Sequence, residues 1–387
     1  LKKTGISESN LYGSSHSQCG GKEIYENRTW YKMIFRCSGK NIRESLSLIN
    51  KLIFSRNFGD AKDRAVAGEK LKQLLKRSDI SDSERFADSK LNSFFYKFNA
   101  YKDECSGVSI LETKKENLKM NVDLLMNRLQ KIYEKIISGS AVINFFCNEG
   151  NYPAVNEAVR NFIKESEIKP LEENKLKFLY EKIPETERKV FSIITPVSSG
   201  SLLVEMNSSE YPSREFAAEK VLLLWFGRHV LFEELRKHHG AYGCTAGICN
   251  NTNTIRIDSA RDPDPNKALL IVEKCLAQLS ELGECKAITE DFVKDQILKT
   301  LSKELGDIRP YIKGRSSFES RLNGLSPNLR KTLIKHIHEL TLQDFIEAGK
   351  RIAEKSKNLK ACIITGDEGQ ACGEVICNFR KINDETE

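Results

Sequence analysis

An arginine and a tyrosine lie six residues apart in the stretch EELRKHHGAYGCTAG, which spans residues 233–247. Arg236 stands near the end of a long apolar helical pattern, Gly240 follows it, and Tyr242 precedes small and β-prone residues. A guanidinium group and a phenol hydroxyl both donate hydrogen bonds. The two side chains could therefore meet over a bound peptide and bind its carbonyl oxygens.

The same stretch also has a purely structural interpretation. Gly240 can be the left-handed residue that often follows a helix. Arg236, Lys237 and His238 suit the C-terminal end of a helix, because the helix dipole favours positive charge there. Tyr242 would then begin a strand. From these residues alone, both interpretations stay open.

The histidines form no recognisable metal-binding pattern. A helical zinc site needs two histidines on one face, three or four residues apart, with a carboxylate nearby. No two of the six histidines are four residues apart, so neither H-E-x-x-H nor H-x-x-E-H occurs. The G-x-S-x-G elbow, the Walker A loop and a G-x-G-x-x-G after a strand are also missing. We therefore predict no catalytic metal site in this chain and no catalysis by the chain alone.

The chain has 11 cysteines, an odd number scattered along 387 residues. This pattern is not a disulfide framework and indicates reduced thiols in an intracellular compartment. Two cysteine pairs share one spacing, and four such thiols could bind zinc: Cys244, Cys249, Cys372 and Cys377. Ordinary buried cysteines are the interpretation that we favour.

The elements that would position Arg236 and Tyr242 belong to an order that occurs twice. Residues 4–15 and 28–40 read as strands, followed by helices, a buried strand at 140–150 and a helix at 152–166. After a charged segment, two strands within 189–207 precede a long helix at 213–239. A hairpin at 241–260, several helices and a closing strand at 360–369 follow. Each copy is expected to be an antiparallel or mixed sheet covered by helices, which is an α+β fold.

The repeat predicts two similar domains. We place the first at residues 1–166 and the second at 190–387, joined by a charged, proline-containing linker at 167–189. In the second domain, Asp264 with Pro265 and Thr341 with Asp344 are typical helix starts.

Composition excludes some classes of protein. Net charge is +7, from 61 basic and 54 acidic residues, and the lysines alternate with glutamates along helices. This balance and the missing RNA- and finger-type motifs argue against a nucleic-acid partner. No apolar run approaches the roughly 20 residues that a membrane helix needs, so no membrane partner is expected. The N-terminus has no apolar signal core and no Met, which suggests a chain that starts inside a longer protein.

Several segments, in the same order, resemble presequence proteases and the related falcilysins. Arg236 and the sequence Gly240-Ala241-Tyr242-Gly243 match an Arg and a Gly-Ala-Tyr-Gly of the C-terminal half, with the same step from Arg to Tyr. The family usually has Gly where this chain has His239. Four other segments also resemble the family. The first strand of its third domain is similar to KKTGISES, and its Y-R-D-P-N stretch is similar to ARDPDPNKAL. Its segment leading to S-x-E-x-R is similar to KGRSSFESRLNGLSPNLRK, and its last strand is similar to ITGDEG.

The resemblance implies a function for the whole chain. These proteins are zinc peptidases of the pitrilysin/insulinase type, built from four α+β domains in two halves that close around a chamber. This chain would be the C-terminal half, which contributes Arg236 and Tyr242 on the loop of Gly240, Ala241 and Gly243 and binds no catalytic metal. Zinc would be held by the N-terminal catalytic half of the same polypeptide. The substrates would be unfolded peptides similar to targeting peptides, and the location a mitochondrion or related organelle.

Two other interpretations remain. The chain could belong to a non-catalytic scaffold or partner subunit of the same fold, in which the metal ligands are lost. A weaker alternative is a basic module that binds nucleic acid through phosphate contacts.

Overall fold

The computed structural model describes residues 14–17, 29–32, 41–54, 61–75, 83–139, 141, 143–166, 168, 182–249, 252–306, 313–314, 316–318, 320 and 326–379. The KKTGISES strand, residues 169–181 of the expected linker and most of residues 313–325 lie outside this part. The chain forms two compact units that each combine separate stretches of sequence. One contains Leu1–Arg77, Leu111–Lys177 and Ile308–Gly324, and the other contains Ser78–Ile110, Phe178–Asp307 and Leu325–Glu387. The domains expected at 1–166 and 190–387 remain a prediction.

The first unit is mainly helical in its described residues. Two short strands pair antiparallel, with Ser14 opposite Lys32. Helix α1 packs against α7, and α2 packs against α6. The elements are β1 (Ser14–Ser17), β2 (Thr29–Lys32), α1 (Ile42–Phe54), α2 (Ala61–Leu75), α5 (Ile110–Lys119), α6 (Val122–Ile137), the short η5 (Glu149–Asn151) and α7 (Tyr152–Glu165).

The buried strand expected at residues 140–150 is wrong for the residues that the structure describes there. Residues 143–148 are irregular, and Phe146 is 53% exposed. Phe145 and Cys147 instead pack on the apolar cluster formed by α1 and α7. An apolar run becomes a strand only when a neighbouring strand pairs with it, and this run buries its side chains against helices.

The second unit contains a six-stranded mixed sheet. Its strand order is β5-β6-β4-β7-β3-β8. Neighbouring strands pair antiparallel from β5 to β7, while β3 pairs parallel with both β7 and β8. The strands are β3 (Lys189–Ile194), β4 (Gly200–Asn207), β5 (Gly243–Cys249), β6 (Thr254–Asp262), β7 (Lys360–Thr365) and β8 (Glu374–Asn378).

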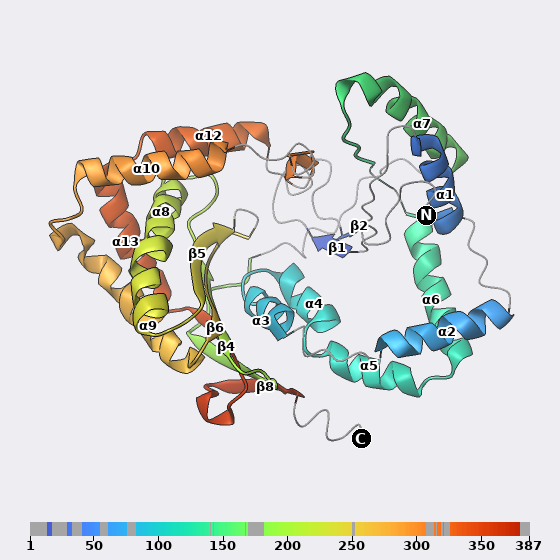
Figure 1. Ribbon diagram of the computed structural model, residues 1–387, viewed down its shortest axis with the longest axis horizontal. Helices are drawn as coiled ribbons and strands as arrows, with labels where there is room; N and C mark the ends of the chain where they lie inside the picture. The colour runs from blue at the N-terminus through green and yellow to red at the C-terminus, as the bar shows by residue number, and fades with distance from the viewer. Residues whose placement is uncertain are drawn as a thin grey trace. The chain divides into compact units, whose positions relative to one another are not determined.

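Helices cover both faces of this sheet (Figure 1). One face carries α8 (Arg214–Trp225), α9 (Pro265–Gln278), α10 (Glu290–Leu305), α12 (Pro327–His338), α13 (Leu342–Ser356) and the short η9 (Leu279–Glu284). The other carries α3 (Ser83–Asn92), which contacts β4 and β7 and leads to α4 (Lys97–Ser106). Strand β4 alternates accordingly: Leu202, Val204 and Met206 join the main core, whereas Glu205 faces α3 through Asn92.

Local side-chain signals set the helix starts. The side chains of Asp264, Thr289 and Ser326 each accept a hydrogen bond from a backbone N–H three residues later. Thr341 and Asp344 form the expected capping box at the start of α13. Because a cap satisfies N–H groups that have no partner within the helix, these starts are readable from sequence.

The α+β class predicted from the sequence is confirmed by this helix-covered sheet. The strands at 189–207, the hairpin of β5 and β6 and the strand at 360–365 all form. The sequence did not predict β8, which adds to the edge of the sheet beside β3. None of the helices described is long and apolar enough to cross a membrane.

Candidate functional site

One long helix brings Arg236 to the site. Helix α8 continues through two π-helical segments, η7 (Phe226–Val230) and η8 (Phe232–His238), which the sequence did not predict. Gly227 brings this helix against β5, because a Cβ there would come within 2.9 Å of the Ala246 nitrogen. Leu235 is fully buried while its neighbour Arg236 is exposed. The buried leucine therefore anchors the helix end and leaves the arginine at the surface.

The helix ends as the sequence predicted. Gly240 has φ +94°, the left-handed conformation that glycine adopts without steric cost. The next residue, Ala241, is buried and donates its N–H to the Leu235 carbonyl at 2.9 Å. This bond turns the chain back toward the sheet and places Tyr242 just before β5.

The backbone of Tyr242 is held by hydrogen bonds, whereas its side chain is exposed to solvent. Its N–H lies 3.1 Å from the Ala260 carbonyl oxygen and 3.3 Å from that of Arg261, both on β6. Its side chain is 62% exposed. The Arg236 guanidinium carbon lies 5.6 Å from the centre of the tyrosine ring, within cation–π range. The structure therefore brings together the two residues that the sequence singled out.

A second arginine, which the sequence analysis did not single out, lies against the same ring. The guanidinium carbon of Arg261 is 4.8 Å from the ring centre of Tyr242. Gly200 pairs with Asp262 and Ser201 with Ala260, so Arg261 is the extra residue of a β-bulge. Its φ is +48°, which is uncommon for a residue other than glycine. The ARDPDP stretch was the available sequence signal, but a bulge depends on how two strands pair.

A buried hydrogen-bond network joins the two loops of the site. Asp262 is fully buried and lies 2.7 Å from Nε2 of His239, whose side chain is 4% exposed. Asp262 also accepts hydrogen bonds from the Ser259 hydroxyl and, at 3.0 Å, from the Asp264 N–H. Nε2 lies 3.2 Å from the Asp264 carbonyl as well. Because both neighbours of Nε2 are acceptors, this nitrogen carries the proton and donates it.

Two positively charged side chains lie near Tyr242, and the carboxylates close to them in the helix contact other residues. The two carboxylates nearest in the helix are engaged elsewhere: Glu233 pairs with Lys237, and Glu234 faces His238. In the described part of the chain, neither Arg236 nor Arg261 forms an ion pair with a carboxylate. Burial raises the pKa of the nearby Cys244 thiol, an effect that the charge of Arg236 partly offsets. The site thus offers a phenol hydroxyl and two guanidinium groups as hydrogen-bond donors.

The described side chains form no cluster of metal ligands. No group of three or more His, Cys, Asp or Glu side chains within the described ranges is placed to hold a metal ion. Cys244 and Cys249 are free thiols.

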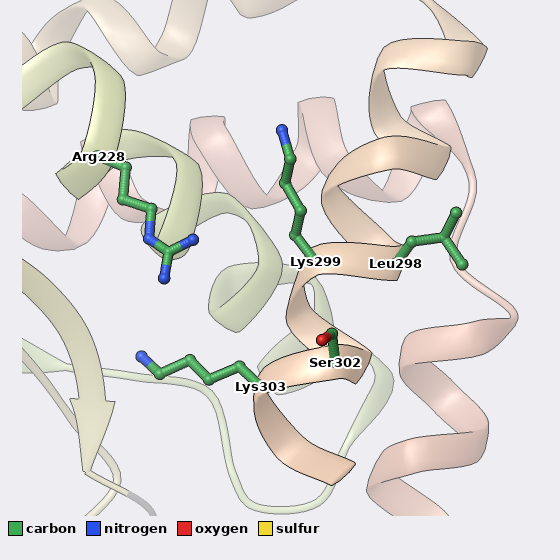
Figure 2. A pocket seen from close by; sticks show the side chains of 5 residues that line it. All are labelled: Arg228, Leu298, Lys299, Ser302 and Lys303. Atoms are coloured by element: carbon green, nitrogen blue, oxygen red, sulfur yellow. The ribbon is translucent and has the colours of Figure 1, made fainter. Parts of the chain in front are cut away.

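A basic pocket of about 520 Å³ lies between η7 and α10. Figure 2 shows its lining, with Arg228 on one helix and Leu298, Lys299, Ser302 and Lys303 on the other. The pocket is open, and Lys299 already pairs with Asp295 at 2.6 Å. It is separate from the residues that contact Tyr242, and the sequence did not predict it.

Comparison with known proteins identifies part of the chain. Residues 203–366, which run from β4 through α13 to the end of β7 and include the site, match the family described as the PreP C-terminal domain. No curated protein sequence matches the chain.

Three solved structures share the fold, each with a TM-score of 0.58. A conserved protein from Enterococcus faecalis V583 is 17% identical and covers 94% of this chain and 82% of its own. The peptidase M16 inactive domain from Pseudomonas fluorescens is 13% identical, with 91% and 80% covered. A protease from Helicobacter pylori is 12% identical, with 94% and 83% covered. Residues 203–366 therefore match the PreP C-terminal domain family, and the chain shares its fold with the peptidase M16 inactive domain from Pseudomonas fluorescens.

Proposed function

We propose that this chain is the substrate-enclosing half of a zinc metalloendopeptidase that degrades unfolded peptides in a closed chamber. The observation that carries the proposal is the pair formed by Arg236 and the exposed Tyr242. This pair lies within the segment that matches the PreP C-terminal domain. Arg236 and Tyr242 would bind the peptide, and Gly240, Ala241 and Gly243 would hold the loop that presents them.

The chemistry of peptide hydrolysis suits these two donors. Negative charge develops on the oxygen of the scissile carbonyl in the transition state. The Tyr242 hydroxyl can donate a hydrogen bond to that oxygen or to a neighbouring carbonyl, and its exposure leaves the hydroxyl accessible. The Arg236 guanidinium is always charged and offers a rigid set of N–H donors. Donors on a separate half would act only when the enzyme closes, which favours peptides small enough to be enclosed.

Zinc is proposed to be bound outside this chain. The described residues do not fit a zinc site, since they offer no cluster of suitable ligands. We therefore propose that the N-terminal catalytic half of the same polypeptide holds the metal. An intracellular location is proposed from the cysteine pattern, and a mitochondrion or related organelle from the family resemblance alone.

Replacing Tyr242 with phenylalanine tests the proposal. In the enzyme that combines this chain with its catalytic half, Tyr242→Phe removes one hydroxyl and is expected to lower kcat/KM for peptide cleavage about 10²–10³-fold. Peptide turnover is followed with a quenched fluorescent substrate, and a thermal melt checks that the variant folds. Tyr152→Phe is the matched control, because Tyr152 is 53% exposed and belongs to the other unit of the chain. If the Tyr242 variant cleaves peptides as fast as wild type, Tyr242 has only a structural role.

A second candidate function is a non-catalytic partner subunit of the same fold. It is favoured by the similarity to a Pseudomonas fluorescens structure that is described as an inactive domain. The two functions differ in the upstream half of the polypeptide: an intact H-x-x-E-H there supports the peptidase, and replaced ligands support the partner subunit. Zinc analysis of the complete protein measures the difference directly.

A further inference from the structure

Arg261 is held at the site by a backbone conformation that is costly for an arginine. It is the extra residue of the bulge between β4 and β6, and its φ of +48° is left-handed. A residue other than glycine rarely adopts this conformation, because its Cβ comes too close to the following carbonyl oxygen. Bulges re-aim side chains, and this one places the Arg261 guanidinium against the ring of Tyr242. The buried Asp262 next to it fixes the bulge through His239, Ser259 and Asp264.

The bulge therefore places a second positively charged group against the exposed ring of Tyr242. Arg236 and Arg261 both lie within cation–π distance of Tyr242, and both are exposed. Among the residues that the structure describes, no carboxylate neutralises either of them. Cation–π contacts offset part of their repulsion, but an anion bound between the guanidinium groups would offset it more fully.

We propose that Arg261 and Arg236 form a subsite around Tyr242 that binds a carboxylate of the peptide substrate. This inference rests on the proposed function, because it takes the ligand of Tyr242 to be a peptide. A guanidinium group matches a carboxylate through two parallel N–H···O bonds, and the second guanidinium group adds further N–H donors. The carboxylate comes either from the C-terminus of the peptide or from an aspartate or glutamate side chain.

Binding of matched peptides to the full chain tests the subsite. Fluorescence anisotropy is measured with a short, unstructured, labelled peptide that carries one glutamate and a free C-terminus. Two companion peptides differ only by C-terminal amidation or by Gln in place of Glu. The companion that lacks the bound carboxylate is expected to bind about tenfold more weakly or worse, as for loss of a charged hydrogen bond. The other companion should bind like the parent, which identifies the source of the carboxylate.

Two substitutions of Arg261 separate the effect of its charge from the effect of its backbone conformation. Arg261→Asn removes the charge while keeping a residue that tolerates the left-handed conformation. It should weaken the parent peptide about tenfold and abolish the difference between the peptides. Arg261→Lys keeps the charge and should restore part of the preference. Arg228→Ala is the control, because Arg228 is also an exposed arginine but lies on η7 and lines a different pocket.

Three results would overturn the subsite: equal affinity for all peptides, no detectable binding of any of them, or an equal loss in Arg261→Asn and Arg228→Ala. The turnover experiment with Tyr242→Phe decides the proposed function separately. If turnover depends on Tyr242 and no carboxylate preference exists, the function stands and the subsite fails. If the preference exists and Tyr242→Phe leaves turnover unchanged, the subsite stands as a binding site and the proposed catalytic role fails.

Discussion

Nε2 of His239 lies 2.7 Å from a carboxylate oxygen of Asp262, and this contact joins the end of a helix to the end of a strand. His239 is the C-terminal cap of η8, and Asp262 is the last residue of β6. Tyr242 follows the first of these residues and Arg261 precedes the second. One buried bond therefore fixes the spacing between two exposed side chains of the site.

Removing the histidine is expected to destabilise the fold. His239→Ala leaves the buried Asp262 carboxylate with only two donors, Ser259 and the Asp264 N–H. Loss of a hydrogen bond to a buried charged group should lower the free energy of unfolding by about 1–3 kcal/mol. Urea denaturation measures this change. His238→Ala is the control, because the His238 side chain is 68% exposed and should contribute less than about 1 kcal/mol. Equal losses in the two variants would show that the buried contact is not special.

The two glycines of the loop should differ in their tolerance of alanine. Gly240→Ala puts a Cβ on a residue with φ +94°, and the nearest atom is 3.9 Å away, so the expected cost is conformational. Such a conformation costs about 1–3 kcal/mol for a residue other than glycine. Gly243→Ala meets no atom within 4 Å and should change stability by no more than about 0.5 kcal/mol. Thermal and urea unfolding of both variants check the prediction, which fails if Gly243→Ala is the more damaging change.

The pH dependence of stability should report on a buried carboxyl group. Glu205 on β4 is 2% exposed, accepts a hydrogen bond from Asn92 of α3, and has one carboxyl oxygen without a hydrogen-bond partner. Burial, and after it the negative charge of Asp88, raise the pKa of Glu205 from 4.5 to about 8, although the positive charge of Arg256 lowers it. At pH values between 4.5 and about 8, the folded chain binds more protons than the unfolded chain. The contribution of Glu205 to stability therefore falls as pH rises through this window.

Replacing that glutamate removes the dependence. The slope that Glu205 contributes is at most about 1.4 kcal/mol per pH unit, and Glu205→Gln should abolish it and make the protein more stable than wild type near pH 8. Urea denaturation from pH 5 to pH 9 measures the difference between the two proteins. Glu281→Gln, at an exposed position on η9, is the control and should keep the wild-type slope. A slope that survives in Glu205→Gln would assign the dependence to other groups.

Local patterns predicted the features that depend on neighbours in the chain. The helix starts at Asp264, Thr289, Ser326 and Thr341 follow from caps within a few residues. The left-handed Gly240 follows from its place after an apolar helical pattern. The strands of the hairpin β5–β6 follow from β-prone residues around a turn. All of these signals act over one or two turns of chain, so a single sequence contains them.

The same local patterns did not predict features that depend on pairing between segments far apart in the chain. Strand β8 lies beside β3 although more than a hundred residues separate them, and β7 lies between β3 and β4. Residues 143–148 have the apolar content of a strand, but Phe145 and Cys147 pack on the cluster of α1 and α7. Whether such a run pairs depends on the strands that tertiary folding brings to it, which propensity does not encode.

The sequence by itself determined the α+β class and the helix ends, because those signals lie within a few residues of one another, and it singled out Arg236 and Tyr242 as residues that could meet across a helix end. Only the tertiary structure decided that Arg261 joins them and that His239 is bonded to Asp262. Both facts require β6 to pair with β4 and β5 in one register, with a bulge at one residue. Register is selected by the packing of whole sheet faces, so it exists only once the sheet has formed.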